Sequence, residues 1–104
     1  MGAPGASPEE LLAVAEAGCF NQALANNFGM NSLTATRVST TVVVRIEQDE
    51  KSRPTITTIH VTTEAAVPEI TEELFQNCAE RARANCTIAR LLKLDLTMTA
   101  KLLG

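Results

Sequence analysis

The chain has 104 residues, of which 45% are hydrophobic and 3% aromatic, and it carries a formal net charge of -3 at pH 7. This length supports a single domain, 1–104. Because the only aromatic residues are three Phe, we expect a core built mainly from Ala, Val, Ile and Leu. The negative charge and scarce aromatic rings argue against nucleic-acid binding, and no apolar run reaches the roughly 18 residues of a membrane-spanning helix. We therefore expect a cytoplasmic protein with neither nucleic-acid nor membrane partners.

The first predicted element is a helix from Pro8 to about Asn27. Ser7 is a suitable N-cap, Pro8 fits the first helical position and Glu10 completes a capping box. Apolar residues occupy nearly every side of this helix, so we expect it to be buried on most faces. The Asn-Asn-Phe-Gly run at 26–29 predicts its end.

Two strands follow, because the spacing of apolar residues changes to a period of two. The first strand begins near Val38, and one of its faces carries Val38, Thr40, Val42, Val44 and Ile46. After a polar turn at 48–54, these residues share one face of a second strand: Ile59, Val61, Thr63, Ala65 and Val67. Ile56 is an odd number of residues away from Ile59, so in a regular strand it would point to the opposite face. This predicts a bulge near Thr57.

A second helix, a short third helix and a last strand complete the chain. Thr71 is the predicted N-cap of the second helix, whose inner face consists of Leu74, Phe75, Cys78 and Ala82. Asn85 predicts a break before a short helix over residues 86–92. The alternation of apolar and polar residues from Leu94 to Leu102 predicts a strand.

The order of helix, strand, strand, helix and strand predicts an α+β fold. We expect an antiparallel sheet of three strands packed on the long apolar first helix. Three strands and one other helix cannot cover that helix on every side. We therefore expect a homodimer in which a second subunit covers the rest.

Cys19 and Cys86 are far apart in the sequence, and each lies in an apolar run. Only the fold can bring them together, so they suggest a thiol pair rather than a metal knuckle. An odd count of three cysteines also favours free or redox-cycling thiols over structural disulfides. Cys78 lies on the predicted inner face of the second helix, about 12 Å along the axis from Cys86, which exceeds the roughly 7 Å limit for a disulfide. We expect Cys78 to be a core residue.

Each of the paired cysteines also has a structural interpretation, as a small buried hydrophobic side chain. A nucleophilic Cys19 needs its thiolate, so a cation or a helix N-terminus must support the charge. Cys86 lies at a predicted helix start, where backbone N–H groups favour a thiolate. The single histidine, His60, has no partner at metal-ligand spacing, so we expect neither a metal site nor a cofactor.

Three blocks of sequence resemble the OsmC/Ohr family of organic hydroperoxide reductases, from about Ser7 to Leu103. They are Ser7-Pro8-Glu9-Glu10-Leu11-Leu12, Ala17-Gly18-Cys19-Phe20 and Arg83-Ala84-Asn85-Cys86. The resemblance implies an OsmC-like fold and an intertwined homodimer with sites at the subunit interface. It also implies a thiol-dependent peroxidase, in which Cys19 attacks an organic hydroperoxide and Cys86 resolves the sulfenic acid. An external dithiol reductant, of the lipoyl type or another thiol, would reduce the disulfide.

The resemblance also implies a role for Glu9, which matches the glutamate that holds an arginine beside the reactive cysteine of the family. That arginine belongs to N-terminal strands expected before Ser7, and it has no counterpart here. On a straight helix Glu9 and Cys19 would lie about 15 Å apart, so they could cooperate only through a bridging cation or a break near Gly18. Without the resemblance, Glu9 is a first-turn acid facing the helix dipole.

A second interpretation of the same sequence belongs to another class of function. It is a non-catalytic OsmC-like module that binds a small apolar molecule or mediates dimerisation, and that keeps the cysteines without the site arginine. The two interpretations differ in the reactivity that they require of Cys19. A peroxidase needs this thiol to react with alkylating agents much faster than a buried core thiol does.

Overall fold

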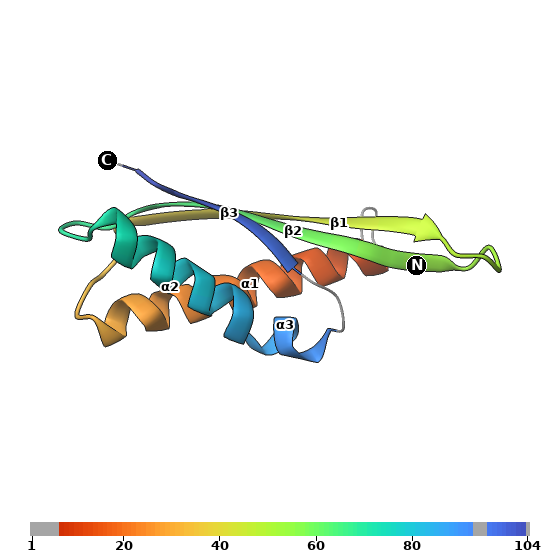
Figure 1. The fold of residues 1–104 in the computed structure, drawn as a ribbon, viewed down its shortest axis with the longest axis horizontal. Helices are drawn as coiled ribbons and strands as arrows, with labels where there is room; N and C mark the ends of the chain where they lie inside the picture. Colours follow the sequence, from red (N-terminus) through yellow and green to blue (C-terminus); the bar gives the residue numbers. More distant parts are fainter. Residues whose placement is uncertain (1–6, 93–95, 104) are drawn as a thin grey trace.

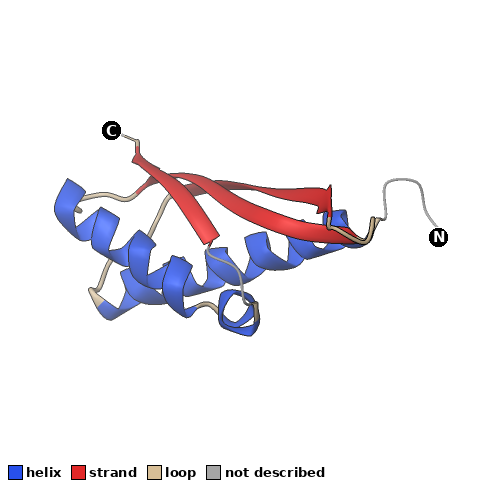
Figure 2. Cartoon of the chain, turned by 45° about the vertical axis from the view of Figure 1, so that its right-hand side comes forward, coloured by secondary structure: helices blue, strands red, loops and turns tan. Residues whose placement is uncertain are grey.

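The computed structural model describes residues 7–92 and 96–103. Its elements in chain order are α1 (Pro8–Met30), β1 (Arg37–Gln48), β2 (Pro54–Ala66), α2 (Glu72–Asn85), α3 (Thr87–Leu91) and β3 (Leu96–Leu102). The strands form one sheet, and the helices lie against one face of it (Figures 1 and 2). This two-layer arrangement confirms the predicted α+β fold class. Leu94, the predicted start of the last strand, lies outside the described residues.

The sheet has the order β1-β2-β3, and its two strand pairs run differently. β1 and β2 are antiparallel, with Val42 opposite Val61. β2 and β3 are parallel, with Ile59 opposite Leu96, so the prediction of an antiparallel sheet is wrong for the third strand. The reason is the connection: α2 runs back from the end of β2 to α3, near the start of β3 (Figure 1). Such a helical crossover is what neighbouring parallel strands need.

The predicted bulge is present in β2. Arg45 of β1 lies opposite Thr58, whereas the next residue, Ile46, lies opposite Ile56. Thr57 therefore has no partner of its own, as expected for one extra residue in a strand. The extra residue turns the side chain of Ile56 to the same face as Ile59, where it packs against the core.

The core lies between the sheet and the pair α1 and α2. The inner face of β2 is buried, and it consists of Ile59, Val61, Thr63 and Ala65. Val67, the residue after the strand, is buried as well. α1 contributes a buried stripe of residues spaced four apart: Glu16, Phe20, Leu24 and Phe28. The rings of Phe28 and Phe75 stack with their centroids 6.1 Å apart, which joins α1 to α2.

α1 begins as predicted. Pro8 is its first residue, and the Ser7 hydroxyl accepts a hydrogen bond from the backbone N–H of Glu10 at 3.2 Å. This bond satisfies one of the N–H groups that have no partner within the helix.

α1 ends at Met30, beyond the predicted end at Asn27. Phe28 is 1% exposed and stacks on Phe75, so tertiary packing favours a further turn despite the polar residues at 26 and 27. The Asn27 side chain donates to the Ala23 carbonyl at 2.8 Å, inside the helix that it was expected to end.

One face of α1 is exposed in the part of the chain that the structure describes. Leu11 is 57% exposed and Val14 is 71% exposed, so burial on most faces is not achieved within the monomer. In the part of the chain that the structure describes, no helix is both long and apolar enough to cross a membrane.

Candidate active site

The fold brings Cys19 and Cys86 together. Cys19 lies on α1, and Cys86 lies at the junction between α2 and α3. Both side chains line the same pocket, which has a volume of about 230 Å³. The remaining lining residues are polar or small: Gln22, Ala23, Asn26, Asn85 and Thr87. Both cysteines are free thiols. The two cysteines predicted to form a pair therefore lie at the same pocket, which has room for a small molecule beside them.

The turn between α2 and α3 positions Cys86. Its backbone is extended, with φ -68° and ψ 151°, between two helical segments. Its N–H donates to the Ala82 carbonyl at 3.1 Å and closes α2, while its carbonyl accepts from the Arg90 N–H at 3.1 Å and opens α3. Cys86 is thus the C-cap of one helix and the N-cap of the next. The predicted break before a short helix is confirmed.

The sulfur of Cys19 accepts a hydrogen bond from the backbone N–H of Ile88 at 3.4 Å. Ile88 lies in the first turn of α3, where N–H groups have no partner within the helix. Cys19 is also the more accessible of the pair, because it is half-buried whereas Cys86 is 2% exposed. A small molecule in the pocket would therefore meet the Cys19 sulfur first.

Cys86 is held as a thiol. Burial raises its pKa to about 12, and the nearby Glu16 carboxyl and the hydrogen bond with Cys19 act in the same direction. The backbone N–H of Ala89 favours the thiolate but does not offset these effects. The expected support from a helix-start N–H group is therefore present, but burial outweighs it. At neutral pH this residue is protonated.

Glu16 is a site residue that sequence reasoning missed. It lies on α1 and is 0% exposed, with its two carboxyl oxygens 3.4 and 3.5 Å from the Cys86 sulfur. Burial raises the pKa of Glu16, and the hydrogen bond from the Cys86 thiol opposes that rise. A usable signal existed, because residues three apart share a helix face and Glu16 stands three positions before Cys19.

Glu9 lies elsewhere on α1. It stands in the first turn of the helix and is half-buried. α1 continues without a break through Gly18, so about 15 Å along the axis separates Glu9 from Cys19. Among residues 7–92 and 96–103, no basic side chain forms an ion pair with Glu9. The structure does not bring Glu9 to the cysteine pair, and its role in the site stays a prediction.

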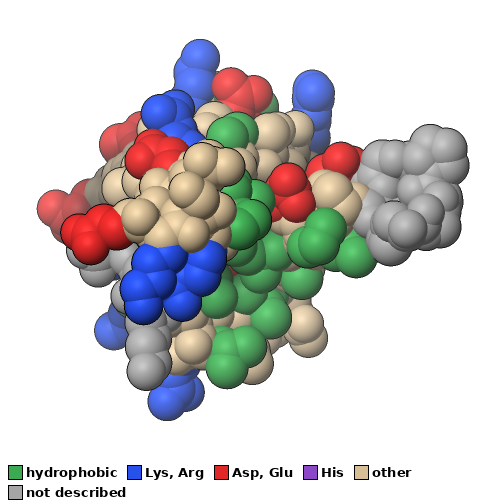
Figure 3. All heavy atoms as spheres, turned by 90° about the vertical axis from the view of Figure 1, so that its right-hand side faces the viewer, with side chains coloured by type: hydrophobic (Ala, Val, Ile, Leu, Met, Phe, Trp, Pro, Cys, Tyr) green, Lys and Arg blue, Asp and Glu red, His purple; other side chains and the backbone are tan. Residues whose placement is uncertain are grey.

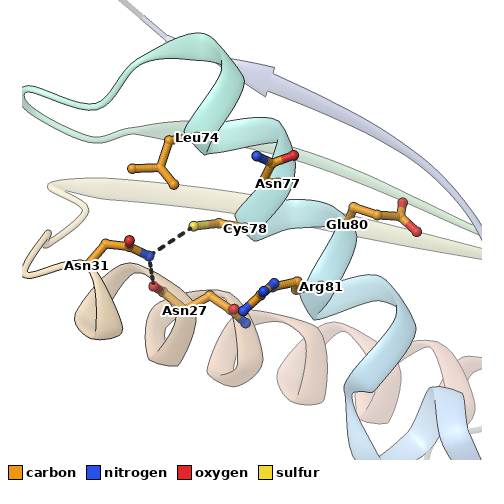
Figure 4. Close-up of a pocket in the computed structure, with 7 residues that line it drawn as sticks. All are labelled: Asn27, Asn31, Leu74, Asn77, Cys78, Glu80 and Arg81. Atoms are coloured by element: carbon orange, nitrogen blue, oxygen red, sulfur yellow. Dashed lines mark hydrogen bonds between the residues drawn. The ribbon is translucent and has the colours of Figure 1, made fainter.

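Cys78 occupies a different place, between α1 and α2 (Figure 4). It is 2% exposed, and the Asn31 side-chain amide donates to its sulfur at 3.8 Å and to the Asn27 carbonyl at 2.9 Å. Burial raises the pKa of Cys78, so this thiol is protonated at neutral pH. The prediction that Cys78 is a core residue is confirmed.

Sequence comparison identifies relatives of the chain. A family model described as "OsmC-like protein" matches residues 1–101. Peroxiredoxin OsmC of Escherichia coli (strain K12) is 34% identical over 101 residues, which cover 97% of this chain and 70% of that protein.

Solved structures show the same fold. An OsmC-like protein of unknown function from Vibrio cholerae superposes with a TM-score of 0.79 at 14% identity, over 89% of this chain and 62% of its own. The organic hydroperoxide resistance protein OhrB of Bacillus subtilis superposes with a TM-score of 0.72 at 21% identity, over 98% of this chain and 73% of its own. This chain thus spans less than two thirds of the Vibrio cholerae chain.

Proposed function

The chain belongs to the OsmC-like protein family, and from this membership and the shared pocket of Cys19 and Cys86 we propose that it is a thiol-dependent peroxidase acting on organic hydroperoxides. The names of its relatives support a peroxidase-like role: one is a peroxiredoxin, and another is an organic hydroperoxide resistance protein. The observation that carries the proposal is the pair of free thiols, Cys19 and Cys86, that lines one open pocket.

The first step is attack by Cys19. Its thiolate takes the terminal oxygen of the hydroperoxide, the O–O bond breaks, and the alkoxide leaves as an alcohol after protonation. The sulfur becomes a sulfenic acid. The N–H of Ile88, 3.4 Å from the sulfur, supports the charge of the attacking thiolate. Cys19 is suited to this step because it is the accessible member of the pair.

Cys86 then resolves the sulfenic acid. Its sulfur bonds to the Cys19 sulfur, the S–O bond breaks, and one water is lost in total. An external dithiol, of the lipoyl type or another thiol, reduces the resulting disulfide by thiol exchange. Because cycling requires a compartment that keeps such reductants reduced, we place the protein in the cytoplasm. Glu9 remains a candidate for supporting Cys19 through a bridging cation.

The rival proposal, a non-catalytic OsmC-like module, requires no special reactivity of Cys19. For a peroxidase we expect iodoacetamide at pH 7.5 to modify Cys19 at least about 10-fold faster than Cys78 or Cys86, because only the thiolate reacts and both other thiols are buried with raised pKa values. Timed alkylation followed by peptide mass mapping measures the three rates. Equal slow labelling of all three cysteines would favour the non-catalytic module.

We also propose that the protein is an intertwined homodimer that covers α1. Figure 3 shows hydrophobic side chains gathered at the end of the molecule where α1 begins and α3 lies. The exposed apolar residues of these helices include Leu11, Val14 and Leu91. Exposed apolar surface of this kind is typical of subunit interfaces.

Sedimentation velocity at micromolar concentration is expected to show a dimer. Changing Val14 to aspartate should shift the species toward monomer, because a charge would then be buried at the interface. The exposed sheet residue Val43 offers a matched control, since Val43→Asp should leave the dimer intact. A stable, folded wild-type monomer would contradict this proposal.

A further inference from the structure

The proposed cycle leaves one buried acid without a task. Glu16 is 0% exposed, and its carboxyl oxygens lie 3.4 and 3.5 Å from the sulfur of the resolving cysteine, Cys86. Among residues 7–92 and 96–103, no lysine or arginine forms an ion pair with it. A buried carboxyl without a cationic partner is costly. Its placement against a reacting atom therefore calls for a chemical role.

Resolution of the sulfenic acid requires that Cys86 lose a proton, because the thiolate is the nucleophile. We propose that Glu16 is the catalytic proton acceptor for Cys86 as this residue attacks the Cys19 sulfenic acid, a role that rests on the proposed peroxidase function. The thiol already donates to the carboxyl oxygens, so proton transfer needs no rearrangement of the pair.

The atoms and electrons of this step balance. The S–H bond of Cys86 breaks and its proton moves to a Glu16 carboxylate oxygen. The freed electron pair on the Cys86 sulfur forms the S–S bond, and the S–O bonding pair leaves Cys19 with the hydroxide. The hydroxide and the proton held by Glu16 together make one water. Cys86 sulfur is oxidised, Cys19 sulfur is reduced, and Glu16 returns to its starting state.

The charges around the carboxyl suit this task. Among residues 7–92 and 96–103, the titratable group that is hydrogen-bonded to it is Cys86, from the junction of α2 and α3. Cys86 shares its pocket with Cys19, which lies one turn beyond Glu16 on α1. Burial raises the pKa of Glu16, which makes its carboxylate a stronger base than an exposed one. The same burial holds Cys86 as a thiol until Cys19 is oxidised, so resolution depends on assistance.

The test separates proton transfer from peroxide chemistry. The Cys19 thiolate attacks the disulfide of Ellman's reagent, which forms a mixed disulfide and releases one thionitrobenzoate. Cys86 then attacks the Cys19 sulfur of the mixed disulfide and displaces the second thionitrobenzoate. Both releases are followed by stopped-flow absorbance across pH 6 to 9 in wild type, in Glu16→Gln, which keeps the shape of the side chain, and in Glu16→Asp. Glu47→Gln, at an exposed position on β1, is the matched control. Far-ultraviolet circular dichroism establishes that each variant is folded.

In Glu16→Gln we expect the first release to stay within about twofold of wild type and the second to slow by about 100-fold at pH 7, the low end of general-base contributions. The wild-type second release should level off above the pKa of Glu16, whereas in Glu16→Gln it should keep rising about tenfold per pH unit. Glu16→Asp should restore the levelling. A second release in Glu16→Gln with the wild-type rate and pH profile would overturn the role of Glu16.

The same variants treated with cumene hydroperoxide distinguish the two proposals. Slow second release together with accumulation of dimedone-trapped Cys19 sulfenic acid in Glu16→Gln supports both. Slow second release, with no Cys19 sulfenic acid in Glu16→Gln and no Cys19–Cys86 disulfide in wild type after cumene hydroperoxide, supports Glu16 as the proton acceptor in thiol exchange and contradicts the peroxidase function.

Discussion

Replacing Cys19 by serine is expected to reduce the turnover of cumene hydroperoxide by at least about 1,000-fold. The serine hydroxyl is not ionised at neutral pH, so the nucleophile of the first step is lost. The measurement is the second-order rate constant, obtained from the consumption of a dithiol reductant at pH 7.

The other two cysteines give internal controls for that result. Cys78→Ser should keep most of the activity, because Cys78 is buried between α1 and α2, away from the pocket that holds the cysteine pair. Cys86→Ser should keep the first oxidation but accumulate sulfenic acid and then sulfinic acid on Cys19, since no resolving thiol is present. Loss of activity in Cys78→Ser, with Cys19→Ser still active, would contradict the assignment of the nucleophile.

Replacing Phe75 by alanine is expected to destabilise the fold by about 3–5 kcal/mol, the usual cost of deleting a buried phenylalanine side chain. Phe75 is 0% exposed, and its ring stacks on Phe28 of α1. For a domain of this size such a loss corresponds to a fall in Tm of more than about 10 °C. Thermal unfolding followed by circular dichroism measures it.

The matched control is Val43→Ala, because Val43 is 56% exposed on the sheet. This change should alter stability by about 0.5 kcal/mol or less. The phenylalanine pair also matters for the site, since it fixes α1 to α2 and thereby Cys19 to Cys86. If Phe75→Ala unfolds at the wild-type temperature, the stacked pair is not the main link between these helices.

The local structure could largely be predicted from the sequence, because it depends on short-range chemistry. The parity of Ile56 predicted the bulge at Thr57, and the hydroxyls of Ser7 and Thr71 predicted two helix starts. These features follow from side-chain direction and from hydrogen bonds over three or four residues.

The direction of the third strand could not be predicted in the same way. An alternating pattern identifies the buried face of a strand but not the neighbour with which it pairs. The path of α2 and α3 decides that β3 runs parallel to β2. Likewise, the stacking of Phe28 on Phe75 extends α1 past the polar residues that predicted its end.

In the candidate site, too, some features could be predicted from the sequence and others depend on tertiary structure. The sequence placed Cys19 and Cys86 in apolar runs and predicted that the fold joins them. It did not predict which thiol would be protonated, because burial and the facing acid depend on tertiary structure. Glu16 was missed because a single acid in a helix is usually solvated, whereas here the fold encloses it against Cys86.

The central claim is that Cys19 and Cys86 form one redox pair, and peptide mapping of the oxidised protein tests it most directly. The reduced protein is treated with one equivalent of cumene hydroperoxide, its remaining thiols are blocked, and it is digested without reductant. The account predicts a dominant peptide pair linking Cys19 to Cys86, with Cys78 recovered as a blocked free thiol. A dominant disulfide that includes Cys78, or full recovery of Cys86 as a free thiol after Cys19 is oxidised, would contradict it.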